Sequence, residues 1–172
     1  MKKRIPKNKR RPFPYFGFFI PILIKKDKSF SIIHAFKFTE SAIYKFDDAD
    51  QYDVNKLFGF SVGMHHKNSF RFGWRPNADL TKIEIVAYEY HQGVRIPTIP
   101  IREVELNRWY EYHLEYIAGR NEVHYIIMEN PKYGEGVTSP ITLKNKLNWG
   151  YKLDLYFGGN KKAPHDIIIY KQ

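Results

Sequence analysis

Apolar and polar residues alternate one by one along much of this chain. The clearest block runs from residue 57 to residue 91, where three alternating stretches are separated by short breaks rich in Gly, Asn, Asp and Pro. A period of two is typical of strands that bury one face. The pattern predicts an all-β protein, an antiparallel β-sandwich of the jelly-roll type, and no segment has a convincing amphipathic helical pattern.

The alternation also assigns faces to two of these strands, residues 69–76 and 81–91. We expect their apolar positions in the core, namely Phe70, Phe72, Trp74, Ile83, Ile85 and Ala87. The opposite faces carry Ser69, Arg71, Gly73, Arg75, Glu84, Tyr88 and Tyr90. These outer faces are therefore either solvated surface or a binding surface.

The same pattern predicts further strands at residues 30–39, 41–46, 151–157 and 165–170. Residues 108–117 and 122–128 alternate on either side of the turn sequence AGRN, which indicates a hairpin. Residues 130–148 contain scattered Gly and Pro, so we expect an irregular connection that crosses one end of the sandwich.

The size and composition fit one packed domain. A chain of 172 residues is long enough for a real core and rather short for two domains. Tyr, Phe and Trp make up 17% of the residues, which suits a pleated surface or a face on which sugars stack. There is no cysteine, so neither a disulfide framework nor a thiolate metal site can form.

Positive charge is concentrated near the N-terminus. Residues 1–28 hold ten Lys or Arg and one acid, which leaves only +1 of the formal net charge of +10 for the rest. Such dense charge stays extended and solvated unless something anionic neutralises it. We therefore expect a basic extended arm over residues 1–28 and a β-sandwich domain over residues 29–172, with a disordered tail or expression remnant as the alternative for the arm. The candidate contacts of the arm with an assembly or with nucleic acid are Lys2, Lys3, Arg4, Lys7, Lys9, Arg10 and Arg11.

The apolar stretch at residues 13–24 resembles the core of a signal peptide. Pro14, Gly17 and Pro21 break the helix that such a core needs, and no small-x-small cleavage site follows. Twelve residues are also too few to span a bilayer. We expect an extended segment that docks on the sandwich or on a neighbouring subunit, with a degenerate signal or an anchor as the alternative.

Strand-borne arginines and tyrosines make a glycan site a candidate function. Rings stack on the C–H faces of sugars, and a guanidinium holds a uronate or a sulfate. The candidate ligand-binding residues are Arg71, Arg75, Tyr88, Tyr90, Asn160 and His165. An ordinary aromatic surface with ion pairs is the alternative interpretation.

Catalytic chemistry has weaker support in the sequence. Glu84 and Glu89 fall on opposite faces, so the paired carboxylates of a glycosidase are missing on this sheet. β-Elimination needs a Tyr or His base and a group that neutralises the acidic sugar, and the candidates for these roles are His65, Arg71 and Tyr156.

No metal or other cofactor is predicted, although calcium is possible at an acidic loop. His65 and His66 are sequential and would point in opposite directions on a strand, which disfavours a shared ion. The loop carries Asp47, Asp48, Asp50 and Asp53, weak candidates for calcium ligands, without the spacing of an EF-hand. A solvated loop with capping or turn roles is favoured over a metal site.

Several segments resemble a known superfamily. The hairpin NRWYEYHLEYIAGRNEVHYIIM is similar to the penultimate hairpin of concanavalin A-like lectin and glucanase sandwiches, and YKLDLYFGGNKKAPHDIIIY resembles their closing strands. The blocks NKLFGFS, FRFGWRP, YFGGN and APHDI also resemble uncharacterised proteins of gut Bacteroidetes and their phages. The superfamily includes bacterial polysaccharide lyases, and the resemblance implies that Tyr156 stands near the tyrosine on their last strand. The lyases' Arg-rich strand and Gln-x-His motif have no clean match here.

These observations favour a non-catalytic recognition or structural protein, placed in a virion-like particle or outside the cell. Its sheet would bind a glycan or a neighbouring protein, and its basic arm would tether it to an oligomer or larger assembly, with nucleic acid bound through the arm only. The alternatives are a lyase that acts on acidic polysaccharide and an exported carbohydrate-binding module.

Overall fold

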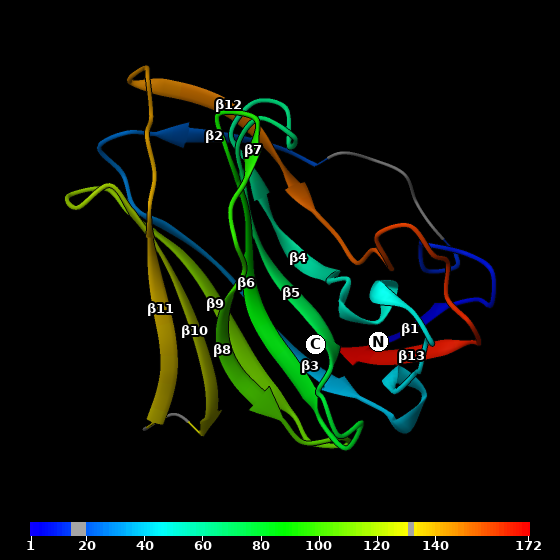
Figure 1. Cartoon of the computed structure of the whole chain (residues 1–172). Coiled ribbons are helices and arrows are strands. Elements are labelled where there is room, and N and C mark those ends of the chain that lie inside the picture. The colour runs from blue at the N-terminus through cyan, green and yellow to red at the C-terminus, as the bar shows by residue number, and fades with distance from the viewer. Residues whose placement is uncertain (15–19, 131–132) are drawn as a thin grey trace.

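The computed structural model describes residues 1–14, 20–130 and 133–172. Two antiparallel sheets face each other as the two layers of a sandwich, which confirms the predicted fold class (Figure 1). The six-stranded sheet runs in the order β1 (Lys2–Ile5), β13 (Ile167–Lys171), β3 (Phe30–Phe38), β9 (Tyr110–Ile117), β10 (Glu122–Asn130) and β11 (Tyr133–Pro140). The seven-stranded sheet runs in the order β2 (Pro21–Lys25), β12 (Leu147–Leu153), β4 (Asn55–Ser61), β5 (Ser69–Pro76), β6 (Ile83–His91) and β7 (Val94–Arg95), and β8 (Ile99–Val104) also pairs with β6.

Aromatic side chains from both sheets fill the core between the layers. Phe72 of β5 packs edge-to-face against Tyr112 of β9 and Tyr125 of β10, with ring centroids 5.4 and 5.2 Å apart. The predicted core faces are confirmed, because the six apolar positions expected inside are all at most 2% exposed: Phe70, Phe72, Trp74, Ile83, Ile85 and Ala87. The alternation of apolar and polar residues therefore identified correctly which face of β5 and β6 points into the core and which points outward.

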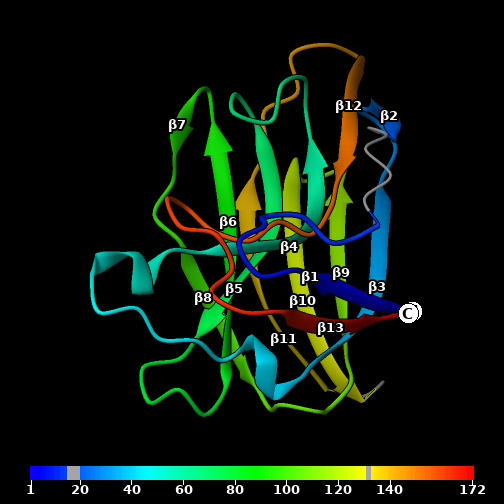
Figure 2. The same cartoon turned by 90° about the vertical axis from the view of Figure 1, so that its right-hand side faces the viewer.

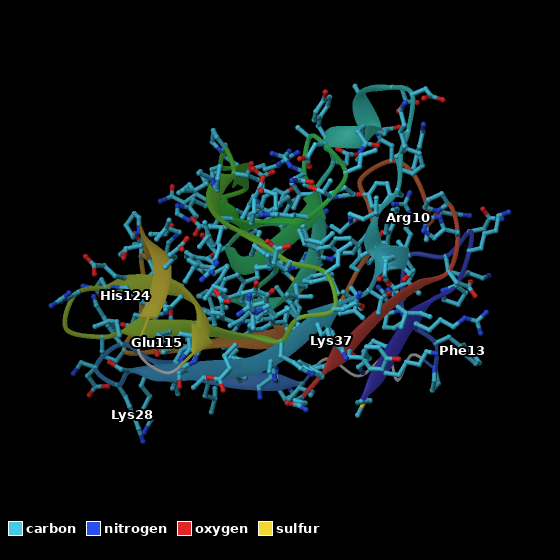
Figure 3. The ribbon with its side chains drawn as sticks, turned by 90° about the horizontal axis from the view of Figure 1, so that it is seen from below. Arg10, Phe13, Lys28, Lys37, Glu115 and His124 are labelled. Atoms are coloured by element: carbon cyan, nitrogen blue, oxygen red, sulfur yellow. The ribbon has the colours of Figure 1, made fainter. Side chains whose placement is uncertain are left out.

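The predicted hairpin is confirmed as β9 and β10, paired from Ile117 and Glu122 outward. The turn between them places Asn121 at a positive φ of 52°, a conformation that Asn adopts more readily than most residues. On the outer face of this hairpin, His124 of β10 lies opposite Glu115 of β9 (Figure 3). The turn chemistry and the alternation thus agree on this element.

The expectation of an irregular connection over residues 130–148 was wrong. Residues 133–140 form β11, an edge strand that pairs with β10 along its length, and β12 begins at Leu147. Gly134 and Gly136 suggested a loop, but both lie in the strand. A Cβ on Gly136 would stand 2.4 Å from the carbonyl oxygen of Tyr125, so glycine here permits close approach of the two backbones.

The strand expected at residues 41–46 is absent. The chain instead forms a short 3₁₀ helix, η1 (Glu40–Ala42), followed by irregular backbone. The hydroxyl of Ser41 contacts that of Thr39 at 2.7 Å and accepts a hydrogen bond from the amide of Ile168 at 2.8 Å. These local bonds satisfy groups that would otherwise need a neighbouring strand.

Residues 1–28 do not form a projecting arm where the structure describes them. β1 pairs with β13 from Lys2 to Ile5, and Ile5 is fully buried. β2 pairs with β12, which agrees with the expectation that part of the apolar stretch docks on the sandwich; residues 15–19 lie outside the described chain. The basic sequence forms strands because backbone hydrogen bonds hold an edge strand, and a high density of basic side chains does not prevent these bonds. The bases are also spread over the molecule, with Arg10 at the opposite end from Lys28 (Figure 3).

No helix within the described residues is long and apolar enough to cross a membrane.

Candidate functional site

A hollow of about 410 Å³ lies on the outer face of the seven-stranded sheet, and we call it the groove. It is lined by residues of β4, β5, β6 and the end of β12, and by residues of the β4–β5 turn, the chain after β12 and the N-terminal segment. Figure 2 shows the N-terminal segment and the chain after β12 crossing in front of this sheet. The residues that line it are Arg11, Lys56, His65, His66, Ser69, Arg71, Tyr88, Tyr90, Lys152, Leu153, Asp154, Leu155 and Tyr156.

Arg71 lies in the floor of the groove, between Gly59 of β4 and Tyr88 of β6 in the strand register. Gly59 makes room for it, because a Cβ at Gly59 would stand 2.9 Å from the Cγ of Arg71 and 2.1 Å from the carbonyl oxygen of Phe70. The Nε of Arg71 is shielded from solvent and has no hydrogen-bond partner among the described residues. Arg71 also forms no ion pair with a carboxylate of the residues that the structure describes. The guanidinium of Arg71 therefore has no carboxylate of the described residues within ion-pair distance.

Burial sets the electrostatics of Arg71. It lowers the pKa of the guanidinium to about 10, while the neighbouring tyrosines, above all Tyr88 and Tyr151, oppose the shift. The group still carries its charge near neutral pH. An anion that entered the groove would meet a guanidinium that has already lost much of its water, which strengthens a charge-assisted hydrogen bond.

Lys56 of β4 adds a second positive charge beside Arg71. Its Nζ donates hydrogen bonds to the carbonyl oxygens of Val54 and Gly158, at 2.8 and 2.9 Å, and lies 4.6 Å from the centre of the Tyr88 ring. Burial, reinforced by the charge of Arg71, lowers the pKa of Lys56 to about 8. The ammonium is held in place by the backbone and stays available to a third acceptor.

His65 lies in the β4–β5 turn and lines the groove. Its Nδ1 is 2.6 Å from the hydroxyl of Tyr151, and its ring is 4.1 Å from that of His66. Burial, followed by the charge of Arg71, lowers the pKa of His65 to about 4. The imidazole is therefore neutral at physiological pH and has one nitrogen able to accept a proton.

Tyr156 is placed in the groove by an isolated β-bridge. The amide of Lys56 donates to the carbonyl of Tyr156 at 2.8 Å, and the amide of Tyr156 donates back at 2.9 Å. The three residues predicted as lyase candidates, His65, Arg71 and Tyr156, thus come from three separate segments and line one groove. Tyr88 and Tyr90, predicted as ligand-binding residues, join them there.

The other three predicted ligand-binding residues lie elsewhere. Arg75 shares the outer face of β5, but its Nε is 2.5 Å from the carboxylate of Glu84. The amide side chain of Asn160 donates to Asp50, and His165 contacts the carbonyl oxygen of Ser41 at 2.8 Å. Of the six candidate ligand-binding residues, the groove therefore brings together Arg71, Tyr88 and Tyr90, and their role in binding stays a prediction.

The acidic loop has capping and pairing roles in the structure. Asp48 caps η2 (Ala49–Tyr52) by accepting from the amide of Asp50 and pairs with Lys161. The carboxylate of Asp53 accepts from the amide of Asn160 at 3.2 Å. Asp47 lies in a neighbouring hollow that also contains Asp48. Within the described chain, no three His, Asp or Glu side chains are arranged to hold a metal ion.

Sequence reasoning missed groove residues that alternation does not mark, and it missed the contact that Tyr151 makes with one residue of the groove. Lys56 sits one residue before a register shift between β4 and β5, so the period of two assigns it to no clear face. Arg11 belongs to a segment that was expected to project away from the sandwich. Tyr151 was assigned to a strand, but its contact with His65 depends on the turn between β4 and β5.

Comparison with known proteins supports the fold only. No known family profile matches the sequence, and no curated protein matches it significantly.

Three solved structures are similar in shape. An exolytic PL7 alginate lyase from Zobellia galactanivorans has a TM-score of 0.54 at 10% identity over 99% of this chain and 92% of its own. A functionally unknown protein from Saccharomyces cerevisiae has a TM-score of 0.54 at 9% identity over 97% of this chain and 77% of its own. An alginate lyase from Klebsiella pneumoniae has a TM-score of 0.50 at 10% identity over 84% of this chain, which spans 59% of that enzyme. What these structures share with this chain is the two-layer antiparallel β-sandwich fold, the fold that the resemblance to concanavalin A-like sandwiches implied.

Proposed function

We propose that the groove binds an acidic polysaccharide, one that contains uronate residues. The observation that carries this proposal is Arg71, a shielded guanidinium without a carboxylate partner among the described residues. Burying such a charge costs free energy, and that cost is recovered when an anionic ligand supplies the missing acceptor. A uronate carboxylate matches the paired N–H groups of a guanidinium.

The tyrosines around Arg71 favour a sugar over a small inorganic anion. Tyr88 and Tyr90 present adjacent rings with centroids 6.0 Å apart, and Tyr156 lines the same groove. Aromatic rings bury the C–H faces of sugars, while their hydroxyls hydrogen-bond to the sugar hydroxyls. The similarity to two alginate lyases supports this ligand class, since alginate is a polymer of uronates.

The direct test compares a polyuronate with a neutral glucan of matched length by isothermal titration calorimetry. We expect saturable binding of the polyuronate and none of the glucan. Equal binding of both polymers, or of neither, would exclude a site built around an unpaired guanidinium.

The affinity for a polyuronate should fall as the pH rises through about 8, the pKa of Lys56. Lys56 is charged below this pH and neutral above it, so one cation of the groove is lost on the alkaline side. We expect a decrease of about threefold to tenfold between about pH 7 and pH 9. Lys56→Met should bind more weakly at neutral pH and show a flat profile over this range. If wild type and variant lose affinity in parallel, the titrating group lies elsewhere.

A second candidate function is β-elimination of the bound polysaccharide. It is favoured because a neutral imidazole, a phenol and a guanidinium line the same groove. Arg71 would neutralise the uronate carboxylate and so acidify the proton on C5. His65 would accept that proton, and the Tyr156 hydroxyl would donate its proton to O4 as the C4–O4 bond breaks and the C4–C5 double bond forms. The protons balance, since one is taken from C5 and one is returned to the leaving sugar at O4.

Tyr156→Phe tests the second candidate. If elimination occurs, the wild type should generate the ultraviolet absorbance of an unsaturated uronate from polyuronate, and the variant should lose about a hundredfold or more of that rate. Polyuronate affinity, measured in parallel, should fall far less, because the ring that packs on the sugar is kept and only one hydroxyl is lost, and this difference separates catalysis from binding. A wild-type protein that binds the polymer without producing this absorbance is a binding protein only.

The assembly role of the basic segment stays a prediction. A tether by Lys2, Lys3, Arg4, Lys7, Lys9, Arg10 and Arg11 is constrained by the described contacts, because Arg4 pairs with Asp166 and Arg10 bonds to the carbonyl oxygens of Gly159 and Asn160. Incorporation of a Lys2→Glu/Lys7→Glu variant into particles would decide it, since unchanged incorporation contradicts the tether.

A further inference from the structure

The N-terminal segment is built into the side of the groove. Residues 6–12, which we call the N-terminal wall, cross in front of the seven-stranded sheet together with the chain after β12 (Figure 2). The two segments are joined by backbone hydrogen bonds, from Asn8 to Ala163 at 2.8 Å, from Ala163 to Lys9 at 3.0 Å and from Phe157 to Arg10 at 2.7 Å. The wall is therefore anchored to the loop that follows Tyr156.

Two adjacent arginines of the wall have different surroundings. The guanidinium of Arg10 donates to the carbonyl oxygens of Gly159 and Asn160 and lies 6.0 Å from the centre of the Tyr156 ring. Arg10 thus fastens the wall to the loop. Arg11 lines the groove itself, and its charge is one of those that lower the pKa of His65. Of these two arginines, Arg10 stabilises the position of the wall and Arg11 contributes its charge to the groove.

The groove contains more positive charge than one sugar carboxylate can neutralise. Among the described residues, four bases line it, Arg11, Lys56, Arg71 and Lys152, against the single carboxylate of Asp154. Asp154 already accepts a hydrogen bond from the amide of Leu155 at 2.8 Å. A hollow of about 410 Å³ also falls within the ~300–1,000 Å³ of pockets that hold drug-sized ligands. The charge and the space both fit a longer anionic ligand.

We propose that Arg11 binds the carboxylate of a second acidic sugar, so that the groove recognises a run of consecutive uronates held between Arg71 and the N-terminal wall. This inference rests on the proposed function and names a specificity-determining residue for it. It also gives the N-terminal basic sequence a role in ligand binding within its own chain.

The test compares two ligands and three variants of the full-length protein. The ligands are methyl glucuronide, titrated by NMR, and a tetrauronate, titrated by calorimetry. The variants are Arg11→Ala, Arg71→Ala and, as a matched control, Lys9→Ala, an exposed base of the same wall that does not line the groove. Thermal melting checks that the fold is retained, and Arg11 is exposed, so its variant should melt as the wild type does.

We expect Arg11→Ala to weaken the tetrauronate about tenfold and to leave methyl glucuronide within about twofold, because one of several charge-assisted contacts is lost. Lys9→Ala should change neither ligand, and Arg71→Ala should weaken both. If Arg11→Ala behaves as Lys9→Ala does while Arg71→Ala weakens both ligands, this inference is overturned and the proposed function stands. If Arg71→Ala has no effect, the proposed function itself fails. Equal losses in Arg11→Ala and Lys9→Ala, with single-stranded DNA competing as well as tetrauronate, would show unspecific charge attraction and overturn the inference.

Discussion

Arg71→Met is expected to weaken polyuronate binding by more than about tenfold and, at the same time, to make the fold more stable. The loss of binding follows from removing the cation that the ligand carboxylate would pair with. The gain in stability follows from removing the same charge from its shielded site. Arg71 keeps its charge in a shielded site without a carboxylate among the described residues, and replacing such a charge with an apolar side chain contributes about 1–3 kcal/mol to the free energy of unfolding.

The matched control is Arg75→Met, the same substitution four residues further along β5. Arg75 pairs with Glu84 and donates to the carbonyl oxygen of Tyr52, and it lies outside the groove. Its loss leaves Glu84 without its partner, so this variant should be less stable than the wild type and should bind polyuronate normally. Urea unfolding and calorimetry give both quantities. The account of Arg71 is contradicted if the two variants shift stability in the same direction, or if Arg75→Met loses as much affinity.

The contrast between Arg71 and Arg75 also shows how far the sequence alone leads. Alternation placed both arginines on the outer face of β5, and this is what the structure has. It says nothing about position along the strand, and Glu84 lies opposite Arg75 whereas Tyr88 lies opposite Arg71. That register decides which arginine is paired within the chain and which is left for a ligand. Arg71, Tyr88 and Tyr90 were predictable as a group because they stand on the outer faces of neighbouring strands.

The elements that the sequence did not predict lack the alternation on which prediction depends. β1 is four residues long and β2 five, both at sheet edges, where backbone pairing matters more than side-chain pattern. β11 contains two glycines, which sequence reasoning assigns to loops although here they allow close backbone approach. Arg11 could be placed in the groove only after the path of the N-terminal segment was known. Missing the edge strands therefore meant missing one side of the site.

Ile5→Ala is the second change with a large expected effect, a loss of about 2–5 kcal/mol from the free energy of unfolding. Ile5 is fully buried and pairs with Ile167 at the end of β1, so truncation leaves a cavity in the core. Lys2→Ala, at the exposed start of the same strand, should stay within about 0.5 kcal/mol of the wild type. Urea unfolding measures both variants. A solvated arm would give two equally small effects, and that result would contradict the pairing of β1 with β13.

The Ile5 variant also connects the fold to the proposed site. The N-terminal wall begins directly after Ile5, so weakening β1 loosens one end of the segment that carries Arg11. At a temperature where Ile5→Ala is still folded, we expect its affinity for a tetrauronate to fall toward that of Arg11→Ala, while methyl glucuronide binding changes little. Preorganisation explains the direction, because a mobile wall must be ordered at the moment of binding and that ordering costs free energy. If the variant binds tetrauronate as tightly as the wild type, Arg11 acts without help from β1, and the wall is held by its bonds to residues 157–163 alone.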